Sequence, residues 1–193
     1  MSFIVGIDGP AGTGKGTITN LVAKDLKLNQ IDTGAMYRAF TLYMLDNKVE
    51  LDEIEKIKEL LEKVKIDLIQ EDDKETVFLN GKDVTKEIRS KSVTNFVSPV
   101  SSIIEVRIKM VELQRKMAEG KNVIMEGRDI TTYVFPNANV KIYLDANVEE
   151  RAKRRYKENI ENAFCAKSTC APVSSSNACR ISRFSLNFAS STT

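Results

Sequence analysis

The sequence predicts a doubly wound α/β fold, and three patterns along the chain indicate it. An apolar run over residues 3–7 leads at once into a glycine-rich loop, after which apolar residues recur at helical spacing. Short apolar runs then alternate with helical patterns along most of the chain. Between two helical patterns the period changes to two, which indicates a small β insertion. Parallel strands joined by helices place ligands at the carboxyl ends of the strands.

Residues 9–17 have the composition of a phosphate-binding loop. Glycines let the backbone turn its N–H groups inward, and Lys15 can reach the β- and γ-phosphates of a nucleoside triphosphate. Helical spacing continues from Ile18, so the positive end of a helix dipole adds to anion binding. Gly16 stands where such loops usually carry a hydroxyl residue, which leaves Thr17 as the candidate ligand for Mg²⁺. The expected ATP-binding residues are Gly9, Pro10, Ala11, Gly12, Thr13, Gly14, Lys15, Gly16 and Thr17.

After the loop and its helix, the sequence predicts one strand and two helices. Residues 30–32 favour a short second strand, and residues 35–45 favour a helix with large apolar side chains. Residues 51–64 predict a further helix, because apolar residues recur at helical spacing among Glu–Lys pairs three and four residues apart.

The segment of period two predicts a hairpin. Ile66 and Leu68 alternate with polar residues, and the run 76–79 ends in Asn80-Gly81, a pair that favours tight hairpin turns. A small β insertion is therefore expected after the helix at 51–64.

The second half of the chain returns to helices and strands. An amphipathic helix is expected over about residues 102–119, and a strand is expected at 122–125. Another strand is expected at 140–144. Asn147 can cap the helix that follows, and Glu150 three residues later would complete a capping box.

Length and composition favour one domain without a membrane span. The 193 residues, 42% of them hydrophobic, are enough for one core. No apolar stretch approaches membrane-spanning length and no signal-peptide pattern opens the chain, so a cytoplasmic location is expected. Cys165, Cys170 and Cys179 form no Cys-x-x-Cys pair and the chain has no histidine, so we expect unpaired thiols and no zinc site.

The last part of the chain differs sharply in composition. Residues 163–193 hold eight serines and three basic residues but no Asp or Glu, whereas residues 1–162 hold all 27 carboxylates. Subtracting those three positive charges from the formal +2 leaves −1 for residues 1–162, so a nucleic-acid-binding surface is not implied. We expect a low-complexity, disordered tail, either of frameshifted origin or a natural flexible extension.

Two arginine-bearing segments follow predicted strands. Residues 32–38 come after the second strand and contain Arg38, and residues 126–129 come after the strand at 122–125 and contain Arg128. Both arginines suit a phosphomonoester, because a guanidinium group binds phosphate in a bidentate manner and stays charged. An isolated Gly-Arg-Asp turn is more often a surface salt bridge, so this interpretation depends on the phosphate-binding loop nearby.

These motifs resemble the bacterial type of cytidylate kinase over residues 1–162. The resemblance implies transfer of the γ-phosphoryl group of ATP to CMP or dCMP, with Mg²⁺, giving ADP and CDP or dCDP. It also implies that an insertion at about residues 63–90 binds the nucleoside monophosphate. The matching segments are Gly9 to Thr17, Asp32 to Arg38, Gly127 to Ile130, Val134 to Pro136, Lys141 to Ala146 and Glu149 to Arg155.

The resemblance also implies which residues bind CMP. They are Thr33, Arg38, Ser98, Arg107, Arg128 and Asp129. Thr33 stands where the family commonly has serine. Cytosine offers an amino donor beside two acceptors, which suits the Asp129 carboxylate together with Arg and Ser donors, whereas uracil would place a carbonyl against Asp129. From the residues alone, Ser98 and Arg107 would be an exposed serine and a solvated helix arginine.

Arg151, Arg154 and Arg155 share one helical face and resemble the start of the family's mobile lid, at about residues 151–162. Lid arginines neutralise charge on the transferring phosphoryl group, so they join Lys15 as the expected catalytic residues. A solvated basic helix face is the alternative interpretation.

The family's remaining lid, a further helix and a final core strand are not recognised in residues 163–193. The chain is therefore expected to be either an active kinase or a C-terminally damaged, catalytically impaired remnant of one. Asn47-Lys48-Val49-Glu50 superficially resembles a motif of switch GTPases, but it ends in Glu and comes too early in the chain. We expect a monomer that binds CMP, dCMP and ATP, without nucleic acid or membrane partners.

Overall fold

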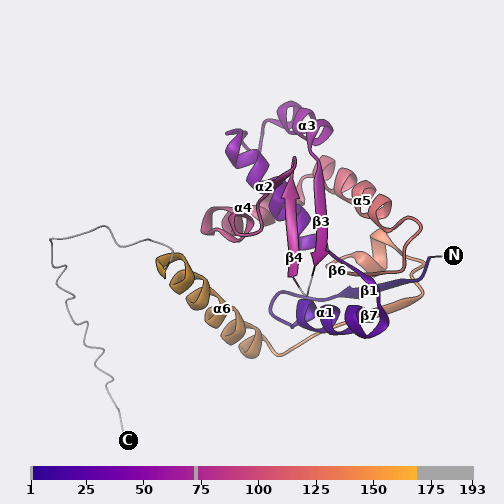
Figure 1. Ribbon diagram of the computed structural model, residues 1–193. Coiled ribbons are helices and arrows are strands. Elements are labelled where there is room, and N and C mark those ends of the chain that lie inside the picture. The colour runs from indigo at the N-terminus through magenta and orange to yellow at the C-terminus, as the bar shows by residue number, and fades with distance from the viewer. Residues whose placement is uncertain (1, 72–73, 169–193) are drawn as a thin grey trace, which may run out of the picture. The chain divides into compact units, whose positions relative to one another are not determined.

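Four parallel strands form the main sheet of the computed structural model, which describes residues 2–71 and 74–168 (Figure 1). Their order is β2-β6-β1-β7, with β6 and β1 in the middle. The Val-Ile-Met run of β6 is buried, as expected for a parallel strand covered on both faces, whereas all four residues of β7 are exposed at the edge. The strands are β1 (Ile4–Asp8), β2 (Asn29–Asp32), β6 (Val123–Gly127) and β7 (Val140–Tyr143).

Helices connect these strands, so the predicted α/β fold is confirmed. Helix α2 begins directly after β2 because the Asp32 side chain accepts a hydrogen bond from the Ala35 N–H at 3.1 Å and caps it. The helices are α1 (Lys15–Leu26), α2 (Thr33–Asp46), α3 (Ile54–Lys63), α4 (Lys91–Ser102), α5 (Ile104–Ala118) and α6 (Val148–Ser168), with the short helical segments η1 (Glu87–Arg89) and η2 (Ile130–Val134).

The predicted β insertion is also confirmed, as a three-stranded antiparallel sheet in the order β3-β4-β5. Its strands are β3 (Ile66–Glu71), β4 (Lys74–Leu79) and β5 (Lys82–Asp83). Asn80 and Gly81 have φ values of 50° and 83°, which is the conformation that the Asn-Gly pair adopts in tight hairpins.

Helix α4 was not predicted, whereas the helix expected over about residues 102–119 is present as α5. The chain forms two helices that break at Ile103, and α4 contacts α2. Its segment holds four serines and Pro99, all weak helix formers, so periodicity did not reveal it. Ser90 accepts from the Val93 N–H and starts the helix, and the buried Val93 and Val100 fix its inner face.

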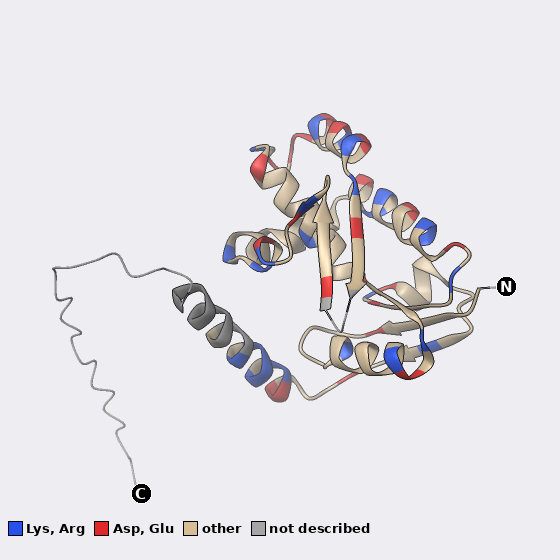
Figure 2. Ribbon diagram, in the orientation of Figure 1, with Lys and Arg blue, Asp and Glu red and all other residues tan. Residues whose placement is uncertain are grey.

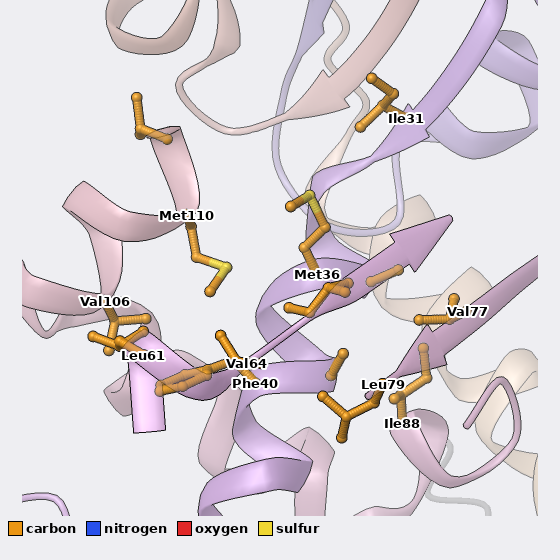
Figure 3. Close-up of a cluster of buried hydrophobic side chains, with 14 of the residues drawn as sticks. Ile31, Met36, Phe40, Leu61, Val64, Val77, Leu79, Ile88, Val106 and Met110 are labelled. Atoms are coloured by element: carbon orange, nitrogen blue, oxygen red, sulfur yellow. The ribbon is translucent and has the colours of Figure 1, made fainter. Parts of the chain in front are cut away.

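One hydrophobic core joins the insertion to the helices beside it (Figure 3). Phe40 and Met36 from α2 meet Val77 from β4 and Met110 from α5, and all four are almost completely buried. Burial on this scale is the largest favourable term in folding, so the insertion is held in place by packing and not only by its two connections to the rest of the chain.

Helix α6 differs from the prediction at its start and extends past the predicted domain boundary. Asn147 caps it by accepting from the Glu149 N–H at 2.9 Å, but Glu150 accepts from Arg154 and does not complete a capping box. The helix continues through Ser168, beyond residue 162. Cys170, Cys179 and the rest of the expected tail from residue 169 lie outside the described residues, so the domain boundary and the thiols stay predictions.

The chain divides into two units between Arg155 and Tyr156. The first unit contains both sheets and the start of α6. In the second unit, the structure describes only the continuation of α6 to Ser168.

Candidate functional site

The phosphate-binding loop forms as predicted, between β1 and α1. Gly14 precedes α1 with φ 89°, a left-handed conformation that other residues adopt only with strain. Thr13 donates its hydroxyl to the Pro10 carbonyl at 3.1 Å, and the Lys15 ammonium donates to the same oxygen at 2.9 Å. Thr17 lies exposed in the first turn of α1. The Lys15 side chain is thus held by a carbonyl of its own loop, so a phosphate group that enters the loop would meet a fixed positive charge.

Lys15 is only 8% exposed. Burial lowers its pKa from the ordinary value, and the nearby Arg128 lowers it further, while Glu126, Asp32 and Asp8 raise it. Desolvation weakens the screening between a charge and its partners, so this ammonium acts strongly on any anion that enters the loop.

The loop that carries Arg128 is fixed to the end of β1. Asp8, the last residue of that strand, accepts three hydrogen bonds: from the N–H groups of Ile130 and Thr131, both at 2.8 Å, and from the Thr131 hydroxyl at 2.6 Å. Arg128 donates to the Gly9 carbonyl at 2.7 Å. Sequence reasoning missed Asp8, although its place between the first strand and the loop was a usable signal. These bonds connect the segment that carries Arg128, a predicted ligand of the acceptor phosphate, to the phosphate-binding loop.

Arg38 lies on the helix that the sequence predicted, and Thr33 begins that helix two residues earlier than expected, but both make contacts within the protein. The buried Thr33 hydroxyl donates to the Glu126 carbonyl at 2.7 Å, which joins the start of α2 to the end of β6. Arg38 donates to the Thr94 hydroxyl at 3.1 Å. Because its hydroxyl donates to protein, Thr33 would have to give up that bond to donate to a phosphate.

Two of the three predicted base-reading residues come together. Arg107 on α5 forms an ion pair with Asp129, and its guanidinium carbon lies 6.0 Å from the centre of the Tyr133 ring. Ser98 lies exposed on α4, where its carbonyl accepts from the hydroxyls of Ser101 and Ser102. The pair presents a donor and an acceptor side by side, which is the pattern that cytosine requires.

Tyr37 is a neighbour of this pair that the sequence did not single out for a role. Burial, followed by the field of Asp129, raises the pKa of Tyr37 to about 12, while Arg107 opposes the shift. Its phenol therefore stays protonated at neutral pH and keeps its O–H as a donor beside the pair.

The predicted lid arginines begin α6. Arg151 donates to the Ala146 carbonyl at 3.1 Å, and Arg154 reaches the Thr13 carbonyl of the phosphate-binding loop at 3.3 Å while pairing with Glu150. A Cβ added at Gly12 would come within 2.9 Å of the Arg151 carbonyl oxygen. Arg155 follows on the same helix. Within the first unit, the start of α6 therefore lies directly against the phosphate-binding loop.

Three carboxyl groups gather at the end of β2, the end of β6 and the start of β4, a cluster that sequence reasoning did not predict. Burial and then the Asp32 carboxylate raise the pKa of Glu126 to about 7, and the same two causes raise that of Glu75 to about 7. A Cβ added at Gly16 would lie 3.3 Å from Glu126 Oε1. A side chain at position 16 would therefore crowd the Glu126 carboxylate.

Two further expectations concern metals and membranes. Among residues 2–71 and 74–168, no three acidic or cysteine side chains form a group that could hold a metal ion. None of the helices in that part of the chain combines the length and the apolar character needed to cross a membrane.

Comparison with known proteins shows which family this chain resembles. The model of the family described as cytidylate kinase matches residues 5–171, so the match extends past residue 162, where the resemblance found from the sequence ends. A cytidylate kinase from Geobacillus sp. is 51% identical over 160 residues, covering 83% of this chain and 71% of that protein. The cytidylate kinase of Bacillus subtilis is 49% identical over 160 residues, covering 83% of this chain and 71% of that protein. The cytidylate kinase of Fusobacterium nucleatum is 51% identical over 160 residues, covering 83% of this chain and 72% of that protein.

Proposed function

Since the chain belongs to the cytidylate kinase family, we propose that it transfers the γ-phosphoryl group of ATP to CMP or dCMP, giving ADP and CDP or dCDP. The observation that supports this most directly is the link between two anion sites: Arg128 donates to the Gly9 carbonyl of the loop that carries Lys15. One site suits the triphosphate and the other suits the monophosphate. Phosphoryl transfer needs the γ-phosphoryl group of the triphosphate and the phosphate of the monophosphate to be in line and in contact.

In the proposed reaction, Lys15 binds the phosphates of ATP and stabilises the charge that spreads over the transferring group. Arg38 and Arg128 hold the acceptor phosphate, with Thr33 at the start of α2 beside them. Arg151, Arg154 and Arg155 approach from α6 and neutralise charge while excluding water. Such arrangements act by positioning and electrostatics, because a loose transition state asks for little covalent chemistry from the protein.

For base selection, we assign Asp129 to the exocyclic amino group of cytosine, with Arg107 and Ser98 as donors to its acceptors. The Arg107–Asp129 ion pair supports the first two assignments, since it places both groups together where α5 meets the loop after β6. Uracil would set a carbonyl against the carboxylate, so CMP should be preferred over UMP.

The proposal includes Mg²⁺ bound together with ATP. Magnesium keeps several waters and is held mainly by substrate phosphates, so it needs few protein ligands. The exposed hydroxyl of Thr17 could serve as one such ligand. When bound, the ion neutralises charge on the β- and γ-phosphates. We also propose that the protein is a cytoplasmic monomer that acts on small nucleotides and has no nucleic acid or membrane partner.

The test is ADP formation from ATP with CMP, dCMP, UMP or no acceptor. We expect ADP formation that depends on CMP or dCMP and falls sharply with UMP. A switch protein would hydrolyse GTP without any acceptor, and an inactive remnant would do neither. Equal ADP formation with and without CMP would contradict the proposal.

A further inference from the structure

Glu75 brings a charge from the insertion to the phosphate-binding edge of the main sheet. It is the second residue of β4, next to the tip of the β3–β4 hairpin, and it pairs with Gln70 across that hairpin. Figure 2 shows an acidic band at this end of β4. The Oε1 atom of Glu75 accepts a hydrogen bond from the Asp32 backbone N–H at 3.4 Å. Because Asp32 caps α2, the carboxyl group of Glu75 lies beside the N-terminus of that helix.

The groups that face Glu75 come from three elements. Asp32 at the end of β2 and Glu126 at the end of β6 repel its negative charge, while Arg89 on η1 attracts it. Lys15 and Arg128 act on the neighbouring Glu126. Since the pKa of Glu75 is raised to about 7, chiefly by burial, the group is mostly ionised at pH 8 and mostly protonated at pH 6.

Two of the groups around Glu75, the Asp32 N–H and Arg89, are of the kind that also bind a phosphate. A backbone N–H at a helix N-terminus and a nearby arginine are typical anion ligands. The same helix, α2, carries Thr33 and Arg38, two of the proposed acceptor-phosphate ligands. Three carboxyl groups already share this edge, so the addition of a phosphate dianion beside an ionised Glu75 would be strongly disfavoured.

We propose that Glu75 is an internal anion that overlaps the acceptor-phosphate site and competes with the phosphate of CMP for it. This inference rests on the proposed function. Binding of CMP then requires the Glu75 carboxylate to take up a proton or to move away from the Asp32 N–H. By linkage, CMP binding favours protonated Glu75, and protonated Glu75 favours CMP binding by the same factor.

The test compares CMP binding by the full chain and by its E75Q variant, using calorimetry at pH 6 and pH 8. Glutamine keeps an oxygen that can accept from the Asp32 N–H and removes only the charge, so the fold should be retained. D67N is the matched control, because Asp67 lies on β3 in a surface ion pair with Lys65 and its substitution removes the same charge from the same sheet. Cytidine, which has no phosphate, is the second ligand.

We expect E75Q to bind CMP about three- to tenfold more tightly than the parent at pH 8, and equally at pH 6, since one pKa unit corresponds to a factor of ten. The CMP phosphate itself titrates near pH 6, but this cancels in the ratio of parent to variant at one pH. Cytidine binding should not differ between the two proteins, and D67N should bind both ligands as the parent does.

Two results would overturn the inference while leaving the proposed function in place: equal CMP affinities of parent and E75Q at pH 8, or a gain that cytidine shares. A gain of the same size in D67N would also overturn it, because a general charge effect would then suffice. If neither parent nor E75Q binds CMP, the proposed function itself fails, and the inference fails with it.

Discussion

Lys15 shows how one side chain concentrates charge in the phosphate-binding loop. It is nearly buried, it donates to the Pro10 carbonyl, and it lies in the fields of Arg128 and Glu126. A charge so held is already in place when negative charge develops on the transferring phosphoryl group, so little reorganisation is needed. Its main contribution should therefore be to the transition state and not to the ground state.

Replacing Lys15 with Met should lower kcat by about two or more orders of magnitude, with a smaller effect on the KM for ATP. Steady-state kinetics of CMP-dependent ADP formation measure both constants. Lys24→Met, on the exposed side of the same helix, is the control and should leave kcat near that of the parent. An unchanged kcat in the Lys15 variant would exclude this role.

Asp129 is expected to decide between bases. The Asp129→Ala variant should lose kcat/KM for CMP by about 10- to 1000-fold and should narrow the advantage of CMP over UMP, because the carboxylate that repels the uracil carbonyl is gone. The measurement is kcat/KM for both acceptors. If the ratio of CMP to UMP does not change, Asp129 does not read the base.

Arg38 provides the comparison for that experiment. As a proposed ligand of the phosphate common to both acceptors, it should affect CMP and UMP alike, so Arg38→Ala should lower both values of kcat/KM and leave their ratio unchanged. A change of ratio in this variant would place Arg38 in base selection and not in phosphate binding.

At the scale of elements, the site depends on how strand ends are joined to the segments that follow them. Asp8 holds the start of η2 through three hydrogen bonds, and Thr33 joins the start of α2 to the end of β6. Neither contact follows from periodicity, because each links segments about 90 or more residues apart. The strands and the loop could be predicted locally, whereas the bonds between them could not.

The carboxyl group at the end of β6 makes stability depend on pH. Burial raises the pKa of Glu126 to about 7 from a usual value near 4.5, so the folded protein binds an extra proton between those values. The favourable contribution of the protonated form is complete below pH 4.5 and is lost as the pH rises through 7. At pH 8 an ionised carboxylate that is 8% exposed destabilises the fold.

Glu126→Gln should therefore raise the free energy of unfolding by about 1–3 kcal/mol at pH 8 and change it little at pH 5. Urea unfolding at the two pH values measures the difference. Glu62→Gln, on the exposed face of α3, is the matched control and should show no such dependence on pH. A gain for Glu126→Gln that is equal at pH 5 and pH 8 would show that burial of the charge is not its cause.

For the whole molecule, the first question is what residues 163–193 contribute. Their composition, rich in serine and without Asp or Glu, contrasts with residues 1–162, where every recognised motif lies. We propose that this segment does not take part in catalysis and that the protein is a poor kinase. The proposed lid would begin with Arg151, Arg154 and Arg155, and its closure would need the segment that follows them to return to the site.

The test replaces residues 163–193 with the corresponding end of the Bacillus subtilis relative. We expect CMP-dependent ADP formation by the parent protein to be at least about tenfold below that of the chimera, because water exclusion and site assembly depend on lid closure. Circular dichroism of both proteins checks that residues 1–162 fold alike. Comparable activity would show that the serine-rich segment works as part of the enzyme.

The sequence by itself determined the parts of this protein that depend on neighbouring residues. Local spacing was enough for the phosphate-binding loop, the strand-and-helix alternation and the Asn80-Gly81 hairpin, because backbone conformation and side-chain period are short-range properties. The resemblance over residues 1–162 supplied the family, which the comparisons confirmed.

Only the tertiary structure decided what depends on distant residues. It formed α4, which was not expected, since burial of Val93 and Val100 outweighs the weak helix propensity of their segment. It set Glu126 against Gly16, and Glu75 beside Asp32, so that three carboxyl groups share one edge of the sheet. Burial and the repulsion between charges depend on distances in space and not on separation along the chain, so no local pattern in the sequence could reveal them.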